Sequence, residues 1–84
     1  MNPKVRTAKV LRDHRLLLEF HNGERRVFDV SPYLHRSVFR QLQESDRFDA
    51  VRVVSGSVEW PGSIDLSYDT LYLESIPAET AAAR

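Results

Sequence analysis

Residues 16–30 read LLLEFHNGERRVFDV, and they set the architecture that we expect for the whole chain. Large apolar residues fall at every second position on both sides of an Asn22-Gly23 pair, which is the pattern of two strands that each bury one face. Asn and Gly both tolerate the positive φ that tight hairpin turns require. The stretch therefore predicts an antiparallel hairpin with one buried face. The side chains expected on that face are Leu16, Leu18, Phe20, Phe28 and Val30.

The residues on either side of this hairpin predict a further strand and a helix. Residues 5–12 mix β-branched and long polar side chains and stop at a turn, as a strand does. Ser31-Pro32 then favours a helix start, because Ser is a preferred N-cap and Pro is tolerated in the first turn. One apolar stripe extends this helix to about residue 45, and Ser37 offers a second start that would split it. The stripe consists of Leu34, Val38, Phe39 and Leu42.

The second half of the chain predicts another hairpin and a short helix. Residues 48–54 are rich in β-branched side chains, and the Ser55-Gly56 turn separates them from a strand at 58–60. Pro61-Gly62 breaks the ladder, residues 64–66 resume an extended piece, and Ser67 can cap a final helical turn.

The expected fold class is therefore α+β. We predict a small two-layer domain, with an antiparallel sheet of about five strands in the order β-β-β-α-β-β-α and one main helix packed on one face. The 84 residues leave no room for a second core, which would need roughly 50 residues of its own. Residues 1–76 should form this single domain, and residues 77–84 a flexible C-terminal tail.

Composition excludes several classes of function. Twelve basic residues balance twelve acidic ones, so no global positive field favours nucleic acid, and the absence of Cys removes thiolate metal sites and disulfides. The longest apolar run is far too short to span a bilayer, and the N-terminus has no signal-peptide core, so we expect a cytoplasmic protein. A thin core makes a homodimer a natural supplement.

Charge is nevertheless unevenly distributed along the chain. Residues 1–42 hold nine basic and four acidic side chains, and residues 43–84 hold three and eight. The basic half suggests contacts with phosphates or with an acidic partner. The bland alternative is a solvated mixed surface on which both halves lie side by side. The arginines proposed for such contacts are Arg25, Arg26, Arg36 and Arg40.

No residue pattern predicts catalysis, a cofactor or a metal. The spacings of His14, His21 and His35 match no metal motif, and we expect surface histidines. No Gly-x-Ser-x-Gly elbow, P-loop or dinucleotide fingerprint is present in the sequence. We therefore expect no enzyme, no catalytic residue, no cofactor and no bound metal.

Residues 59–72 are the most informative stretch for binding. Amphipathic aromatic residues stand beside carboxylates there, a combination that interface hot spots and ligand pockets both use. The structural alternative is that Trp60 closes the core, that Asp65 bonds the backbone of a turn, and that Asp69 sits in the first turn of a helix. The candidate binding residues are Trp60, Asp65, Tyr68, Asp69 and Tyr72.

Two motifs, at 20–34 and 58–72, together resemble the bacterial domain-of-unknown-function family 2442, over about residues 5–75. The chain departs from the family pattern at Gly62, one position early, and at Tyr68, where Pro is common. The matching residues are Phe20, Gly23, Phe28, Asp29, Pro32, Phe48, Trp60, Pro61, Asp65, Leu66, Asp69, Leu71 and Tyr72.

The resemblance implies an α+β sheet domain without an established activity. It also implies an accessory or regulatory module, often encoded beside another small protein in an arrangement similar to toxin–antitoxin pairs. The first functional hypothesis is a non-enzymatic protein-binding module, with a partner encoded nearby or a second copy of itself. The alternative is a nucleic-acid-binding accessory that uses the basic N-terminal half, which zero net charge disfavours.

Overall fold

The first hairpin has the expected register and buries the expected face. In this computed structural model, which describes residues 1–82, β2 (Arg15–Phe20) pairs with β3 (Arg25–Asp29) and with β1 (Val5–Leu11), antiparallel in both cases. Leu16 lies opposite Phe28, and both side chains are fully buried. The short strand β7 (Ile76–Pro77) adds to the free side of β3 and completes a four-stranded sheet in the order β1-β2-β3-β7.

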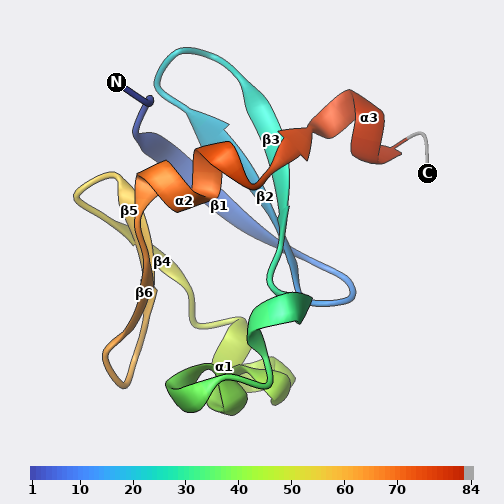
Figure 1. Cartoon of the computed structure of the whole chain (residues 1–84), viewed down its shortest axis with the longest axis vertical. Coiled ribbons are helices and arrows are strands. Elements are labelled where there is room, and N and C mark those ends of the chain that lie inside the picture. The colour runs from blue at the N-terminus through green and yellow to red at the C-terminus, as the bar shows by residue number, and fades with distance from the viewer. Residues whose placement is uncertain (83–84) are drawn as a thin grey trace.

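The second hairpin forms a sheet of its own, so the prediction of one sheet with about five strands is wrong. β4 (Arg52–Val54), β5 (Ser57–Trp60) and β6 (Ile64–Leu66) pair antiparallel in sequence order. Each hairpin turns most of its large apolar residues to one face, and each sheet covers that face of the other. The α+β class is confirmed, with two sheets in place of one (Figure 1).

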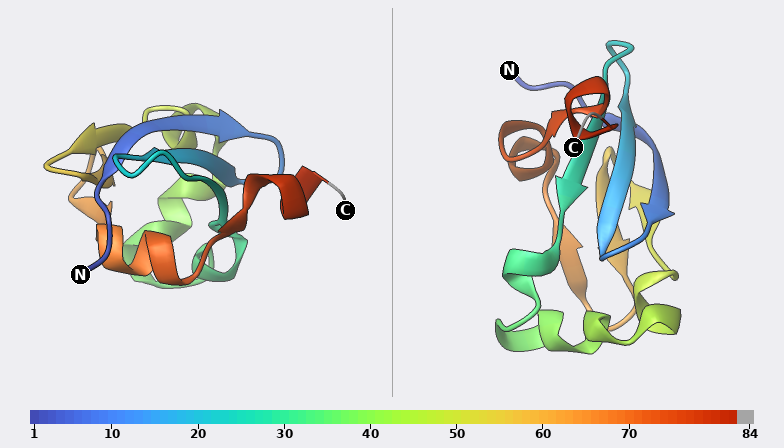
Figure 2. Two further views of the ribbon diagram at one scale, coloured as in Figure 1. Left: turned by 90° about the horizontal axis from the view of Figure 1, so that it is seen from above. Right: turned by 90° about the vertical axis from the view of Figure 1, so that its right-hand side faces the viewer.

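The single main helix expected over residues 31–45 is absent. The segment consists of two 3-10 helices, η1 (Ser31–Tyr33) and η2 (Ser37–Gln43), followed by the one-turn helix α1 (Ser45–Phe48). Extended backbone at Arg36 and at Glu44 interrupts the helical path twice. The segment does split at Ser37, as one reading of the sequence allowed. It closes one end of the molecule (Figure 2).

The strand expected over residues 48–54 is shorter than predicted, because its first residue ends the preceding helix and residues 49 and 50 form a turn. Phe48 ends α1 and is buried, and pairing with β5 begins only at Arg52. Ser67 caps α2 (Tyr68–Leu73) as expected, accepting a hydrogen bond from the backbone N–H of Thr70 at 3.3 Å.

Secondary structure continues into the segment expected to be a tail. Pro77 pairs with Arg26, and residues 78–82 form the short helix α3 (Ala78–Ala82) beside β3. The last two residues of the expected tail lie outside the described residues. Among residues 1–82, no helix is long and apolar enough to cross a bilayer.

One core joins both sheets and the helical segment. Large apolar side chains from β1, β2 and β3 meet those of β5 and β6, and α2 contributes one leucine. The most deeply buried of these are Val5, Leu16, Leu18, Phe20, Phe28, Val30, Leu42, Val58, Trp60, Ile64 and Leu71.

Candidate binding face

Trp60 lies in the core and lines no surface. Its side chain is 1% exposed, and its indole N–H donates a hydrogen bond to the backbone carbonyl of Phe48 at 2.9 Å. A group this deeply buried cannot contact a partner. The candidate role of Trp60 at the rim of an interaction surface is therefore wrong, and the structural alternative is confirmed.

Tyr72 joins α2 to the tip of the first hairpin. Its hydroxyl donates to Glu24 Oε2 at 2.7 Å, while the Arg26 guanidinium lies 4.8 Å from the centre of its ring. Arg26 also donates to the hydroxyl and the backbone carbonyl of Ser75, both at 2.8 Å. The bond from Tyr72 lowers the pKa of Glu24, and that carboxylate in turn raises the pKa of Tyr72. Arg26 is thus committed to internal contacts, contrary to its expected role on phosphates or an acidic partner.

The remaining candidates of the 59–72 stretch do not converge on one site. Asp69 lies in the first turn of α2 and accepts a hydrogen bond from the Asn2 side chain at 2.9 Å. Tyr68 is half-buried, with the Lys4 ammonium 5.6 Å from its ring centre. Asp65 is exposed on β6 in the three-stranded sheet, whereas Glu24 and Arg26, which contact Tyr72, belong to the first hairpin. The stretch supplies turns and contacts between elements rather than a shared pocket.

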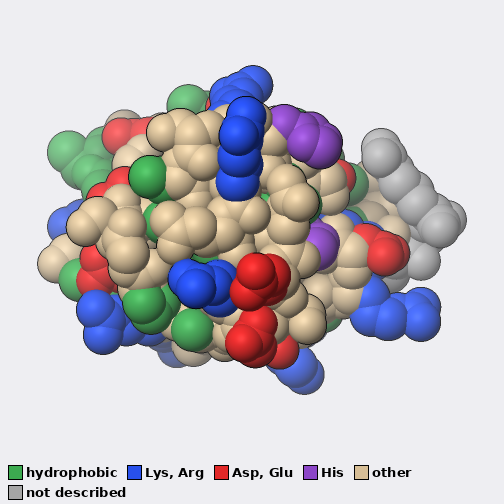
Figure 3. All heavy atoms as spheres, turned by 90° about the horizontal axis from the view of Figure 1, so that it is seen from below, with side chains coloured by type: hydrophobic (Ala, Val, Ile, Leu, Met, Phe, Trp, Pro, Cys, Tyr) green, Lys and Arg blue, Asp and Glu red, His purple; other side chains and the backbone are tan. Residues whose placement is uncertain are grey.

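Arg36 and Arg40 lie far from the other proposed arginines. Both are exposed at η2, where Arg36 stacks 5.1 Å from the ring centre of Tyr33 and Arg40 donates to the carbonyl of His35 at 3.4 Å. Arg25 lies near the tip of the first hairpin, at the opposite end of the molecule (Figure 1). Acidic and basic side chains are interspersed over the end that η1, η2 and α1 form (Figure 3). The four arginines therefore form no common phosphate-binding face.

The histidines show one departure from expectation. His21 and His35 are exposed, as predicted, but His14 is partly buried with its ring against the edge of Phe48, 5.0 Å between centres. Its Nε2 atom has no hydrogen-bond partner within the described part of the chain, residues 1–82. Within residues 1–82, no group of three His, Asp or Glu residues is placed to hold a metal ion.

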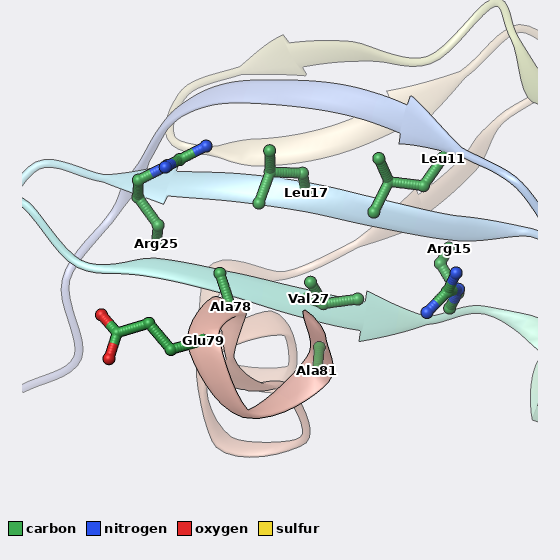
Figure 4. A pocket seen from close by; sticks show the side chains of 8 residues that line it. All are labelled: Leu11, Arg15, Leu17, Arg25, Val27, Ala78, Glu79 and Ala81. Carbon is green, nitrogen blue, oxygen red and sulfur yellow. The ribbon is translucent and has the colours of Figure 1, made fainter. Parts of the chain in front are cut away.

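The outer face of the four-stranded sheet carries a groove of about 550 Å³ that sequence reasoning missed (Figure 4). Its floor consists of Leu11, Leu17 and Val27, one residue from each of β1, β2 and β3. The register places Leu17 directly opposite Val27, and α3 forms one wall with Ala78 and Ala81. The face turned away from the core is therefore apolar at its centre.

The signal for this groove was present in the sequence. Leu17 and Val27 stand at outward-facing positions of the predicted hairpin, where polar residues are the usual choice for a solvated sheet face. What the sequence did not show is that these two residues are direct cross-strand partners, and that a helix beyond residue 77 would wall them in.

Arginines occupy both ends of the groove. Arg25 lies at one end and Arg15 at the other, with Leu17 and Val27 between them (Figure 4). Among residues 1–82, no carboxylate lies within 4.0 Å of either guanidinium. Arg15 donates to the carbonyl of Arg12 at 3.2 Å, and the exposed Glu79 lies on the α3 wall. The cross-strand neighbour of each arginine is acidic, Asp29 for Arg15 and Glu19 for Arg25, but Asp29 accepts a hydrogen bond from the Ser31 N–H at 2.9 Å and Glu19 pairs with Arg6. The groove therefore has an apolar centre and an unpaired arginine, within residues 1–82, at each end.

The ion pairs do not balance the basic first half of the chain against the acidic second half. Each pair found among the described residues joins two residues of the same half of the chain, so none neutralises the basic half with the acidic one. The first half builds most of the four-stranded sheet and the second half builds the three-stranded one. The pairs are Arg6–Glu19, Arg26–Glu24, Arg47–Glu44 and Arg52–Glu59.

These features define a small α+β domain of two antiparallel sheets, with an apolar, cation-flanked groove on the outer face of one of them. A family model described as "Protein of unknown function (DUF2442)" matches residues 5–77. The chain belongs to this family, which confirms the resemblance drawn from its two motifs. The comparisons found no matching curated protein and no matching solved structure.

Proposed function

We propose that this chain is a non-enzymatic protein-binding module with a regulatory role, and that it binds through the outer face of the four-stranded sheet. One observation carries the proposal: Leu11 and Leu17 face outward and are only half-buried, beside Val27, which is 8% exposed. The arginine at each end of this row forms no ion pair with a carboxylate of residues 1–82. The free energy of association becomes more favourable when a partner removes aliphatic surface from water. A cationic rim adds selectivity for that partner and speeds association.

The side chains of the groove support binding rather than catalysis. Its lining consists of aliphatic residues, two arginines and the carboxylate of Glu79, with no nucleophile beside a base. The groups whose pKa is displaced lie elsewhere, in hydrogen bonds between elements such as that from Tyr72 to Glu24. Those bonds hold elements together, and so a catalytic role has little to rest on.

Nucleic-acid binding is the second candidate, favoured by the same two arginines. Sequence-independent binding of single strands uses aromatic side chains on which bases stack, and the floor of this groove is aliphatic. Arg36 and Arg40 lie at the other end of the molecule and add nothing to this face. The protein partner therefore ranks first. A second copy of this chain and a small protein encoded beside it are the first partners to test.

The test is an affinity capture that compares two matched substitutions. Leu17→Thr removes the apolar centre of the groove while keeping a good strand former, and Val54→Thr makes the same kind of change on the other sheet, where Val54 is 40% exposed. Tagged wild-type protein and both variants are incubated with extract of the native cell, with and without nuclease. Captured proteins are then identified.

The proposal expects a stoichiometric protein that survives nuclease, remains with Val54→Thr and is lost with Leu17→Thr. Capture that both variants retain equally would place the binding surface elsewhere and overturn the proposal. Recovery of nucleic acid alone, released by salt, would move the second candidate to first place.

A further inference from the structure

We infer that the groove on the outer sheet face accepts an amphipathic helix of a partner protein, whose apolar stripe carries an acidic residue at each end. This inference rests on the proposed function, because it names the occupant of the same surface. Three properties of the groove lead to it: the position of the sheet's hydrogen bonds, the separation of Arg15 and Arg25, and the charge of the rim.

The hydrogen bonds of the sheet favour a helical occupant over an extended one. β2 lies under the groove and pairs with β1 on one side and β3 on the other, so its backbone groups are used within the plane of the sheet. A strand laid on that face would find no partners for its own backbone, whereas a helix satisfies its backbone internally. The helix α3 already packs on this face in that way.

The separation of the two arginines fixes the spacing of the acidic residues. Arg25 lies opposite Glu19, which is four residues from Arg15 along β2, so the two arginines are about 13 Å apart along the strand. On a helix, residues about seven or eight positions apart share one face and are separated by about 11 to 12 Å. An acidic residue at each of those positions can reach one guanidinium. Apolar residues between them, one turn from each, would lie over Leu17, which is half-buried, whereas Val27 is already 8% exposed.

The rim charges orient this helix across the groove. Lys9 lies opposite Leu17 on the β1 side and, among residues 1–82, has no carboxylate within 4.0 Å. Glu79 on the α3 side and Asp29 on β3 repel carboxylates, whereas Glu19 on β2 is paired with Arg6 of β1. The acidic residues of the occupant therefore lean toward β1 and its apolar stripe toward α3. Carboxylates recognise arginine through charge-assisted hydrogen bonds, which an aliphatic floor partly shields from water.

The experiment selects helical peptides from a displayed library in which the positions of one amphipathic face are randomised. Selection is run on the wild-type protein, on Leu17→Thr and on the double variant Arg15→Glu/Arg25→Glu. Wild type should enrich peptides with acidic residues about seven or eight positions apart around an apolar stripe. The double variant should enrich Lys or Arg at those same positions. By fluorescence anisotropy, the best wild-type peptide should bind the double variant at least about tenfold more weakly.

The outcomes separate this inference from the proposed function. Peptides that need Leu17 but show no acidic preference would overturn the inference and leave the binding module standing. Enrichment that is the same on wild type and Leu17→Thr would overturn both. The third outcome is that no peptide binds the wild-type protein, while a labelled DNA duplex binds the wild type but not the double variant. That outcome would also overturn both. Sedimentation that shows self-association lost in Leu17→Thr would make a second copy the occupant and overturn the inference alone.

A folding control accompanies each variant. Circular dichroism melts establish that Leu17→Thr and the double variant keep the wild-type structure. If Leu17→Thr does not fold, Leu11→Thr replaces it, because Leu11 lies at the margin of the same floor on β1. The acidic preference is then judged on that variant by the same criteria.

Discussion

Trp60 donates its indole N–H to the backbone carbonyl of Phe48, at 2.9 Å, while the two rings stack with their centres 5.8 Å apart. This pair ties the three-stranded sheet to the end of α1. The helical segment that closes one end of the core is thereby fixed to β5 by both a polar and an apolar contact.

Replacing Trp60 by Phe should therefore destabilise the domain by more than the loss of buried apolar area alone would predict. The substitution removes the indole donor from the Phe48 carbonyl, which keeps only the longer hydrogen bond from the Val51 N–H at 3.3 Å. The lost hydrogen bond costs about 0.5 to 1.5 kcal/mol, and the smaller ring also opens a space in the core. Urea denaturation followed by circular dichroism measures the loss. Val38→Ala is the control, because Val38 is 41% exposed and should change stability by less than about 0.5 kcal/mol. Equal stabilities of the two variants would contradict the role assigned to this hydrogen bond.

Phe28 tests the hairpin at the centre of the fold. Its side chain is 1% exposed and lies opposite Leu16, so Phe28→Ala should cost about 3 to 5 kcal/mol. In a domain this small that loss removes much of the total stability, and the variant should be largely unfolded at physiological temperature. Heteronuclear NMR spectra would show the collapse of amide dispersion. A loss below about 1 kcal/mol would mean that the β3 register is wrong.

Gly56 and Gly23 form a matched pair for testing how closely the sheets approach. Both have positive φ, +82° and +90°, but a Cβ on Gly56 would lie 2.6 Å from Lys4 Cβ, whereas one on Gly23 would meet nothing within 4 Å. Gly23→Ala should therefore cost only the conformational penalty, about 1 to 2 kcal/mol. Gly56→Ala should cost clearly more, since it also pushes apart the contact where Val5 N–H donates to the Gly56 carbonyl at 2.8 Å. Thermal melts compare the stabilities of both variants. Equal losses of stability would show that the Lys4 side chain moves aside at no cost.

The sequence predicted the parts of the fold that local patterns determine. Large apolar residues at every second position around Asn22-Gly23 predicted the hairpin and its buried face, and the Ser67 cap identified the start of α2. The expected helix failed because the spacing of Leu34, Val38, Phe39 and Leu42 fits one face only on a continuous α-helix. Extended backbone at Arg36 breaks that continuity and leaves Val38 exposed.

The candidate site was harder to predict because it depends on contacts between distant residues. Trp60 and Tyr72 were predicted to bind a partner because they are aromatic residues near carboxylates. The fold places Trp60 in the core, and Tyr72 donates a hydrogen bond to Glu24, 48 residues away. The groove, in contrast, is lined by ordinary leucine, valine and arginine residues. Only the register of β2 with β3, and the path of the chain after Pro77, bring them together.

The hydrogen bond between Tyr72 and Glu24 makes a prediction about acid titration. Because that bond lowers the pKa of Glu24 below its ordinary value of 4.5, the folded state is favoured above the unfolded pKa. This contribution is lost as the pH falls through the lowered folded value. Tyr72→Phe should move the Glu24 titration midpoint upward, toward its ordinary range, in carboxyl ¹³C NMR spectra. Leu73→Ala, at an exposed position of the same helix, is the control and should leave the midpoint where it is. An unmoved midpoint in Tyr72→Phe would contradict the assigned cause.

Tyr33 makes the corresponding prediction at alkaline pH. Burial, and then its hydrogen bond to Glu74 Oε1 at 2.5 Å, raise the pKa of Tyr33 from 10.0 to about 12. Since the folded pKa lies above the unfolded one, the neutral phenol contributes stability that is fully present below pH 10.0 and is lost as the pH rises toward about 12. The pKa of Tyr72 is also raised, so the titration is performed in a Tyr72→Phe background. Ultraviolet difference titration of this folded variant should show a late tyrosinate step. Tyr33→Phe should remove that step, and Glu74→Gln should shift it to lower pH without removing it, because burial remains. A late step that persists in Tyr33→Phe would assign it to another of the three tyrosines and would break the proposed link between η1 and the end of α2.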